Sequence, residues 1–296
     1  MAFFELSHWR EGGERVPTPL GALFVRRQVE PRLPVLLLLH GFPSASWDFA
    51  PLWEPLSAHF SLVTLDLLGF GDSAKPKRHR YAIAEQAELC EWLLRREGAW
   101  DYHVLAHNYG ATVAQELLAR QRDTRKPRPA LRSAVFLNAG LFPETHRPRL
   151  VQRLLASPLG GVVAALSGKA RFAAGMAAIF GKQTPPSPQF IDGLWRLLET
   201  HDGSRVLPQL LRYMAERRKQ RARWVGALQG STLPMALVNG SADPVSGAHM
   251  VQRWRELVGE ADITELPAIG HYPHVEAPEQ VLAAATAFWS RHGLLR

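Results

Sequence analysis

Four turns of the chain carry side chains of the types that hydrolytic enzymes use. Asn108 lies between a short apolar run and a helical segment, Asp243 follows a later apolar run, and His271 follows the last one. A nucleophile, an acid and a histidine in this chain order can form a triad in which the acid orients the histidine. The fourth turn, His40-Gly41-Phe42-Pro43, can present a backbone N–H to an oxyanion. Together the four turns predict a hydrolase site with residue 108 at the nucleophile position.

The turn around Asn108 has the form of a nucleophile elbow. It reads Ala106-His107-Asn108-Tyr109-Gly110, with a small residue on each side of the centre. A tight strand-to-helix turn forces its central residue to positive φ, which Asn and Asp tolerate better than other residues with a side chain. Gly110 allows the helix to approach the strand. An ordinary loop between a strand and a helix is the alternative interpretation.

Each of the other turns also has a structural alternative. We expect the backbone N–H groups of Phe42 and Tyr109 to form an oxyanion hole, although the first turn can simply end a strand. Asp243 either accepts the ring N–H of His271 or caps the helix that begins near Ser246. A single loop histidine is most often solvated. The occurrence of all four features in one order favours the hydrolase site.

Apolar runs alternate with helical segments over most of the chain. This alternation predicts an α/β fold with a mostly parallel central sheet and helices on both faces. It stops between about residues 140 and 231, where helix formers and prolines replace the strands. We therefore expect a core formed by residues 1–140 and 232–296, and a helical cap formed by residues 141–231. The cap leaves from the carboxyl end of a strand, so it should roof the site. The expected strands are Val35–His40, Leu62–Asp66, His103–His107, Ser133–Asn138, Met235–Asn239 and Ile263–Leu266, and the expected core helices are Tyr81–Glu97, Gly110–Arg120, Ser246–Val258 and Pro278–Arg291.

Composition excludes several other classes of protein. The 296 residues carry 29 Arg and 6 Lys against 27 acidic residues, but no nucleic-acid motif accompanies this charge. The densest basic run, Arg212–Arg223, is interpreted as a solvated helix face. Cys90 is the one cysteine and lies in a helical pattern, which indicates a small buried residue. We expect no metal site, no cofactor, no nucleic-acid partner and no membrane span. The N-terminus lacks the pattern of a secretion signal, so we expect a cytoplasmic protein.

These motifs resemble the α/β-hydrolase fold superfamily over nearly the whole chain, from about Leu20 to Phe288. The resemblance is carried by the His40–Pro43 turn, the segment DLLGFGDS at 66–73, the elbow, Asp243 and His271. Within the superfamily, the chain is most similar to the branch with a carboxylate nucleophile, which contains epoxide hydrolases and dehalogenases. Further similarity to an epoxide-hydrolase-like subgroup lies in Tyr109–Leu118, Leu141–Pro148, Arg217–Leu228 and His271-Tyr272-Pro273.

One departure from that branch concerns the chemistry directly. The resemblance implies an Asp that attacks a carbon atom and becomes an ester, which His271 and water then cleave. This chain has Asn108 at that position, and an amide is a poor nucleophile. We therefore expect the first half-reaction to fail in this form. The amide is a substitution made to capture a complex, a natural feature of a binding protein, or the precursor of an Asp formed by hydrolysis in place.

The resemblance also suggests which side chains contact the substrate. Epoxide hydrolases place two Tyr, or a His and a Tyr, over the ring oxygen. Here the cap offers Tyr213, with His146 or His201 as its partner. Tyr213 can equally be a packing residue, and the two histidines can be surface or capping residues. Dehalogenases hold the halide with Asn or Trp side-chain donors. The matching positions here are Phe42 and Tyr109, which lack a suitable donor. Dehalogenation is therefore disfavoured unless Trp47 or Trp195 supplies one. The candidate substrate-binding residues are His40, Trp47, Phe142, His146, Trp195, Tyr213 and Tyr272. Their aromatic character favours a small apolar substrate.

Two other classes of function use the same fold. A non-catalytic protein would use the same cap to enclose a small hydrophobic ligand. A serine esterase is disfavoured because residue 108 is not Ser.

Overall fold

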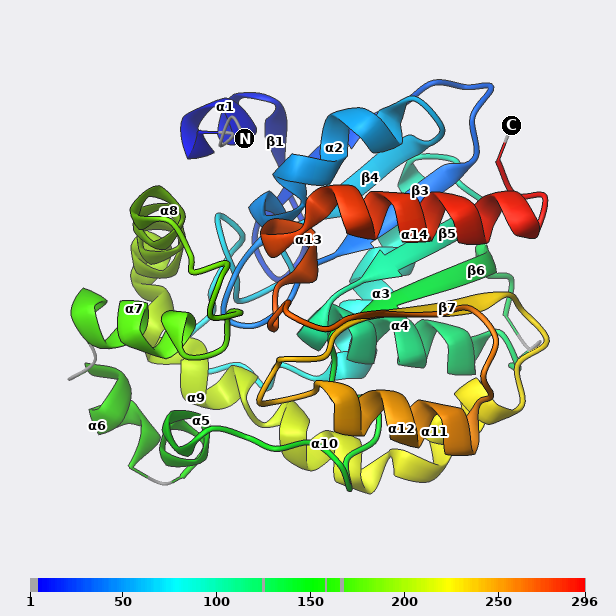
Figure 1. The fold of residues 1–296 in the computed structure, drawn as a ribbon. Helices are drawn as coiled ribbons and strands as arrows, with labels where there is room; N and C mark the ends of the chain where they lie inside the picture. The colour runs from blue at the N-terminus through cyan, green and yellow to red at the C-terminus, as the bar shows by residue number, and fades with distance from the viewer. Residues whose placement is uncertain (1–4, 124–125, 158, 166–167, 296) are drawn as a thin grey trace.

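The computed structural model describes residues 5–123, 126–157, 159–165 and 168–295. An eight-stranded sheet forms its centre, in the order β1-β2-β4-β3-β5-β6-β7-β8 (Figure 1). The six strands β3 to β8 run parallel to one another. The antiparallel strand β2 pairs with β1 and β4. The strands are β1 Gly13–Val16, β2 Leu23–Gln28, β3 Val35–Leu39, β4 Ser61–Leu65, β5 Asp101–Ala106, β6 Ala130–Leu137, β7 Met235–Gly240 and β8 Ile263–Leu266.

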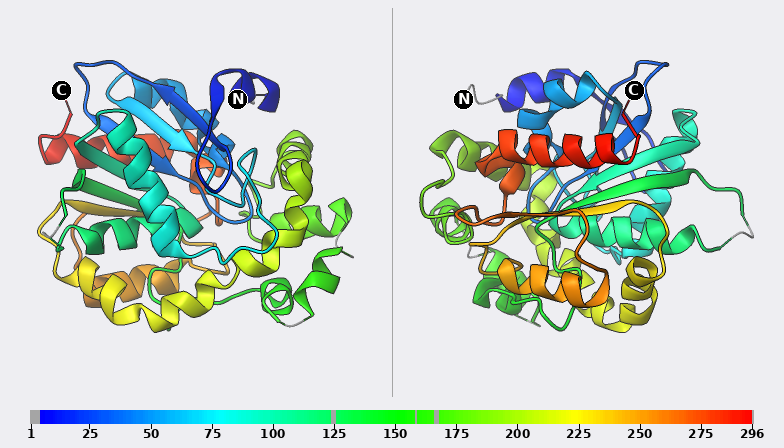
Figure 2. Two further views of the ribbon diagram at one scale, coloured as in Figure 1. Left: turned by 180° about the vertical axis from the view of Figure 1, so that it is seen from behind. Right: turned by 45° about the vertical axis from the view of Figure 1, so that its right-hand side comes forward.

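Helices cover both faces of this sheet. One face carries α2, α13 and α14, and the other carries α3, α4, α11 and α12 (Figures 1 and 2). The helices outside the cap are α1 Leu6–Glu11, η1 Ser46–Phe49, α2 Ala50–Ser57, α3 Ile83–Arg96, α4 Asn108–Arg120, α12 Ala248–Leu257, α13 Pro273–Glu276 and α14 Pro278–Arg291. The strands and helices expected from the sequence all form, with ends shifted by a few residues at most.

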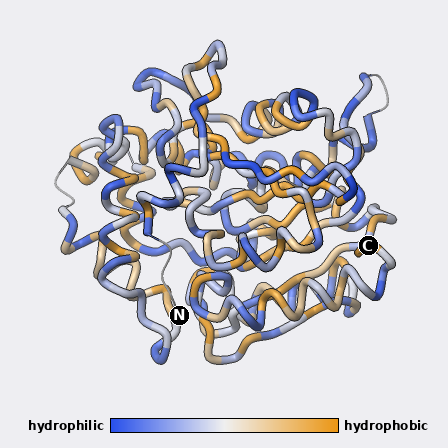
Figure 3. The backbone as a smooth tube through the Cα atoms, turned by 90° about the horizontal axis from the view of Figure 1, so that it is seen from above, coloured by the Kyte–Doolittle hydropathy of each residue, from blue (hydrophilic) through white to orange (hydrophobic). Residues whose placement is uncertain are grey.

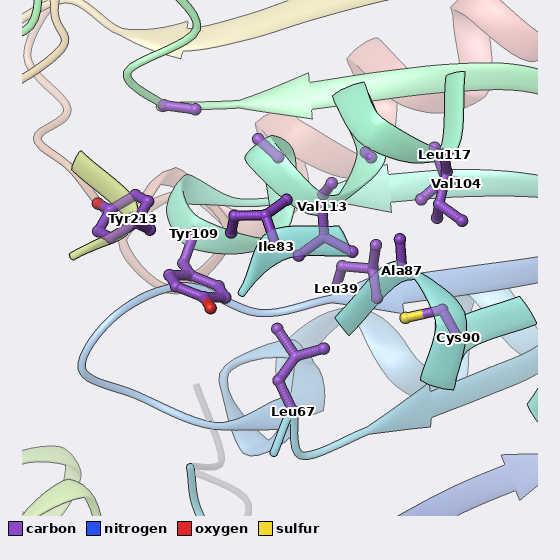
Figure 4. Packing of buried hydrophobic residues seen from close by; sticks show 14 of the residues in the cluster. Leu39, Leu67, Ile83, Ala87, Cys90, Val104, Tyr109, Val113, Leu117 and Tyr213 are labelled. Atoms are coloured by element: carbon purple, nitrogen blue, oxygen red, sulfur yellow. The ribbon is translucent and has the colours of Figure 1, made fainter. Parts of the chain in front are cut away.

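Two apolar cores lie on the two faces of the sheet. Along β3, Leu37 and Leu39 belong to one core while Leu36 and Leu38 belong to the other, because successive strand residues point to opposite faces. Apolar segments accordingly run through the middle of the molecule, between polar outer loops (Figure 3). Cys90 is buried in the first core beside Ala87, where burial raises the pKa of its thiol (Figure 4). The cysteine therefore packs as a small apolar residue.

The segment between β6 and β7 is helical among its described residues. Its helices are α5 Leu150–Leu155, α6 Gly160–Ala165, α7 Lys169–Ala177, α8 Pro188–Glu199, η2 Thr200–Val206, α9 Leu207–Leu210, α10 Tyr213–Lys219 and α11 Arg221–Gln229. Helices α5 to α9 extend beyond the carboxyl ends of the strands (Figure 1). Helix α11 instead packs along α4, where Arg223 and Trp224 donate to Glu116 at 2.8 and 2.7 Å. The part of the segment that lies over the strand ends therefore stops before α11.

The basic run at 212–223 is not uniformly solvated. Arg217 is buried, contrary to the expectation of an exposed helix face. Its guanidinium donates to the main-chain oxygen of Gly140 and lies 4.7 Å from the centre of the Tyr213 ring. The Gly140 oxygen and the aromatic face of Tyr213 stabilise this buried cation, although its Nε has no hydrogen-bond partner. Arg217 thus fixes α10 to the loop that leaves β6.

Candidate active site

Asn108 lies at the sharp turn between β5 and α4. Its φ is +47°, which confirms the left-handed backbone predicted for the centre of the elbow. The backbone N–H of Gly110 donates to the carbonyl oxygen of His40 at 2.9 Å. This bond holds the first turn of α4 directly against the end of β3, so the side chain of residue 108 projects at the carboxyl edge of the sheet.

We expect Gly110→Ala to lower the free energy of unfolding by about 2 kcal/mol or more, because the added methyl overpacks this contact. A Cβ at Gly110 would lie 2.3 Å from the carbonyl oxygen of Leu39, and backbone atoms cannot yield as a flexible side chain can. Gly226→Ala is the matched control. It lies within α11, has open space around its Cβ, and should raise stability by about 0.5–1 kcal/mol. Urea unfolding of both variants checks the prediction; equal stabilities would contradict it.

The Asn108 amide is held at both of its polar ends. Its Oδ1 accepts the backbone N–H of Phe42 at 3.2 Å, and its Nδ2 lies 2.5 Å from Nε2 of His271. Asn108 is nearly buried, with 5% of its surface exposed. The second expected oxyanion donor, the N–H of Tyr109, lies in the first turn of α4, where helix N–H groups have no partner within the helix. Of the two expected oxyanion donors, the Phe42 N–H therefore contacts the oxygen of residue 108 directly.

His271 connects Asn108 to Asp243. Nδ1 of His271 lies 2.6 Å from Oδ2 of Asp243, and both side chains are buried. With Nδ1–H donating to the carboxylate, Nε2 carries the lone pair that accepts from Asn108, so one neutral tautomer satisfies both contacts. The structure thus brings the three residues of the predicted triad together in a single chain of hydrogen bonds.

Asp243 has more partners than His271 alone. Its carboxylate also accepts from the backbone N–H groups of Val245 and Ser246, at 2.7 and 3.0 Å, and from the Ser246 hydroxyl at 2.7 Å. Burial acts to raise the pKa of Asp243, but the interaction with His271 and these hydrogen bonds outweigh it and hold the pKa below its usual value. Asp243 therefore remains a carboxylate that can orient the imidazole.

Asn138, at the end of β6, is a site residue that the sequence reasoning did not select. Its Nδ2 donates to Asp243 at 3.0 Å, and its main-chain oxygen accepts the N–H of Asn108 at 3.1 Å. Its Oδ1 also accepts the N–H of Gly240 at 2.6 Å. One residue thus ties the elbow to the acid loop. Asn138 is the polar residue at the end of an apolar strand. The other site turns share this position, so it is the feature by which the sequence could have indicated Asn138.

An apolar cavity of about 460 Å³ lies between His271 and the cap, and Asn108 and Asp243 lie behind its lining. His271, Phe42 and Val245 line it from the core, and side chains from α5 to α9 form most of the rest of its wall. Among the proposed substrate-binding residues, Trp195 lines the cavity. The polar members of the lining, besides His271, are Arg149, Gln152, Arg171 and Ser204. The volume suits a small apolar molecule.

The cap residues proposed as ring-opening acids lie outside this lining. Tyr213 is buried against Tyr109, with ring centres 4.8 Å apart, which is the packing role that the sequence left open (Figure 4). Nδ1 of His146 lies 3.3 Å from a guanidinium nitrogen of Arg217, and burial lowers the pKa of this imidazole to about 2. His201 is exposed beside Arg15. Tyr213 and His146 are therefore not positioned to donate to a substrate in this cavity.

Four further candidate substrate-binding residues support the site from behind the cavity wall. Nδ1 of His40 lies 2.8 Å from the oxygen of Gly41, and its Nε2 accepts the N–H of Leu67, so this ring holds the oxyanion loop. Trp47 packs against Phe190 of α8. Phe142 is fully buried in the first core. Tyr272 donates its hydroxyl to the oxygen of Phe42 at 3.4 Å. None of the four is part of the cavity lining.

Three buried side chains behind the triad bring potential metal ligands together. Asp48, His107 and His274 offer atoms that all lie within 4.8 Å of one another, the one such group among the described residues. Burial raises the pKa of Asp48 well above its usual value and lowers the pKa of His274 to about 3, so His274 is neutral near neutral pH. His107 is 2.8 Å from the main-chain oxygen of His271. Sequence spacing predicted no metal site because the three residues come from separate segments.

Known proteins resemble this chain in sequence and in fold. The sequence model described as "Alpha/beta hydrolase family" matches residues 36–285. The chain belongs to this family. The α/β-hydrolase fold and the family resemblance predicted from the motifs are therefore confirmed.

Two relatives cover most of the chain. The "Putative hydrolase LipZ" of Mycobacterium tuberculosis is 41% identical over 277 residues, which cover 94% of this chain and 95% of that protein. The "Mesoderm-specific transcript homolog protein" of Homo sapiens is 39% identical over 263 residues, covering 86% of this chain and 78% of that protein.

Solved structures with low sequence identity share the fold. A haloalkane dehalogenase, DbeA, from Bradyrhizobium elkani superposes with a TM-score of 0.77 at 20% identity, covering 93% of this chain and 95% of that one. The epoxide hydrolase CorEH superposes with a TM-score of 0.75 at 16% identity, covering 94% and 98%. At these identities the likeness extends to the fold alone.

Proposed function

We propose that the site of this hydrolase-family protein is built to hydrolyse a small apolar epoxide through an ester on residue 108, and that Asn108 keeps it inactive before the first step. The observation that supports this proposal is the direct contact between the side chain of residue 108 and Nε2 of His271, a residue that lines the apolar cavity. If His271 is the general base, it lies beside the group that would carry the ester.

The reaction would proceed in two half-reactions once residue 108 is a carboxylate. A carboxylate oxygen forms a bond to an epoxide carbon, the ring C–O bond breaks, and the ring oxygen takes up a proton from solvent. His271 then removes a proton from water, whose oxygen attacks the ester carbonyl. Collapse of that intermediate breaks the ester C–O bond, the departing alkoxide takes the proton from His271 to complete the diol, and residue 108 returns one proton to solvent as it becomes a carboxylate again. The N–H groups of Phe42 and Tyr109 would stabilise the tetrahedral oxyanion on residue 108.

An amide at position 108 cannot begin this sequence. The amide is neutral, and its nitrogen lone pair is delocalised into the carbonyl group. Its Nδ2–H also donates to Nε2 of His271, which occupies the lone pair that a water molecule would use. The inactive state of the Asn108 form therefore has two causes, a missing nucleophile and an occupied base.

The leaving ring oxygen needs a donor from the cavity wall. Since Tyr213 lies outside the lining, we assign this role to the hydrogen-bond donors Ser204 and Gln152. Trp195 instead supports a second candidate function, because an indole N–H can stabilise a departing halide. Dehalogenation of a small haloalkane is thus the alternative that a specific observation favours.

A substrate panel distinguishes these classes. We expect the Asn108→Asp form to turn over an aryl epoxide, and Trp195→Phe in that background to leave this activity unchanged. A haloalkane activity that falls about a hundredfold on Trp195→Phe would instead establish the dehalogenase, since that is the usual effect of removing one charge-stabilising donor. The measurement is steady-state kcat/KM with an epoxide, a bromoalkane and a nitrophenyl ester. If no class is turned over while apolar ligands still bind saturably, the protein is a ligand binder.

A further inference from the structure

Exposed apolar side chains are concentrated on two adjacent helices of the cap. Of the seven large hydrophobic residues exposed in the described part of the chain, five lie between residues 150 and 162, and Leu150 is 72% exposed. Helices α5 and α6 carry four of them, and Leu159 stands between the helices. These helices form the outer end of the cap, away from the sheet (Figure 1). We name this surface, consisting of Leu150, Val151, Leu154, Leu159 and Val162, the α5–α6 patch.

The chain around the α5–α6 patch carries charge of one sign. No acidic residue occurs between Glu144 and Asp192, whereas six Lys or Arg residues do. Arg147, Arg149 and Arg153 are exposed and adjoin the patch in sequence. Elsewhere the chain mixes both signs, with 27 acidic residues in all. An apolar surface whose neighbours in sequence are cationic and not acidic complements a surface that is apolar inside and negatively charged outside.

The patch is continuous with the cavity. Val151 and Leu154 are exposed, and both also line the cavity above His271. Arg149 lines it too, so the basic border reaches the same wall. A molecule leaving an apolar phase at this surface would therefore remain in contact with apolar side chains until it reached His271.

We propose that the α5–α6 patch docks the protein on an anionic lipid surface, from which an apolar substrate enters the cavity. Large exposed apolar side chains insert into the headgroup region, and the flanking arginines are attracted to anionic lipids. No helix in the described part of the chain has the length and hydropathy to cross a bilayer. The association is therefore peripheral and reversible. It does not depend on the chemistry proposed above, so it is measured without turnover.

The test is sedimentation of the full chain with lipid vesicles. We expect binding to phosphatidylcholine vesicles that contain phosphatidylglycerol, weaker binding to pure phosphatidylcholine, and loss of binding as salt rises. The double variant Leu150→Asn, Leu159→Asn and the charge variant Arg153→Glu should each weaken partition by about tenfold. Val29→Asn is the matched control, because Val29 is an exposed apolar residue that follows β2 beside the start of β4, at the end of the sheet opposite the cap. It should bind like the parent.

Three results would overturn the proposal. One is no sedimentation with either kind of vesicle. Another is binding that the patch variants leave unchanged. The third is a parent chain that forms dimers in light scattering and becomes monomeric in the double variant, because a second copy would then be what covers the patch. Thermal unfolding of each variant establishes that it is folded, and substitutions at such exposed positions should change stability little.

Discussion

Replacing Asn108 by Asp should raise kcat/KM for an aryl epoxide by about ten-thousand-fold or more, the scale on which removal of a triad nucleophile lowers activity. The amide and the carboxylate have nearly the same shape, and both tolerate the left-handed backbone at this position. The variant should therefore keep the bond from Phe42 and gain a negative charge that can attack carbon. Its carboxylate accepts but does not donate, so Nε2 of His271 also becomes free for water.

The control for this prediction is the covalent state of the unchanged chain. Intact mass and peptide mapping show whether Asn108 remains an amide during incubation, since hydrolysis replaces an NH2 group by a hydroxyl and releases ammonia. Activity that grows with time in step with this mass change would mean that the chain makes its own nucleophile. Asn108→Ala should stay inactive throughout. Equal inactivity of the Asp and Ala forms toward every substrate class would contradict an enzyme of this mechanism.

In the Asn108→Asp background, His271→Gln should allow the first half-reaction and block the second. Because the carboxylate attacks carbon without a base, an ester with the substrate should accumulate to one equivalent, while steady-state turnover falls by at least about a thousandfold. The variant should fold, since Asp243 retains its bonds from Val245, Ser246 and Asn138. Intact mass after substrate addition measures the trapped ester directly.

The control is His8→Gln, which alters an exposed histidine on α1. It should show full turnover and no added mass. If His271→Gln neither accumulates ester nor loses turnover, His271 is not the base that cleaves the ester. Loss of turnover without any ester would place His271 in the first half-reaction instead. Either outcome would contradict the order of steps that the contact between residues 108 and 271 suggests.

The sequence predicted the triad because its residues stand at the ends of buried parallel strands. Apolar runs such as Val35–His40 have few alternatives to a central strand, and the residues after them must lie at one edge of the sheet. Positive φ at Asn108 followed from the tightness of the turn. The N-terminal strands β1 and β2 were not identified, because the exposed ends of these outer strands are polar and lack a continuous apolar run.

The cavity wall could not be predicted in the same way. Aromatic residues such as Phe142 and Trp47 were chosen for their type, but type does not distinguish a wall that contacts substrate from packing one layer behind it. Tyr213 has the chemistry of a ring-opening acid, but its ring packs against Tyr109. In the cap, the orientation of each helix depends on packing between short helices, which local sequence does not encode. Asp48, His107 and His274 were missed because only the tertiary fold brings them together.

The left-handed turn at residue 108 has a consequence for inheritance. Codons for asparagine and aspartate differ by a single nucleotide, and the elbow accommodates either residue without strain or change of volume. A lineage can therefore lose or regain the nucleophile in one mutational event that leaves folding and abundance untouched. Selection for a stable protein would not detect that event, so only selection on turnover can preserve an acid at this position.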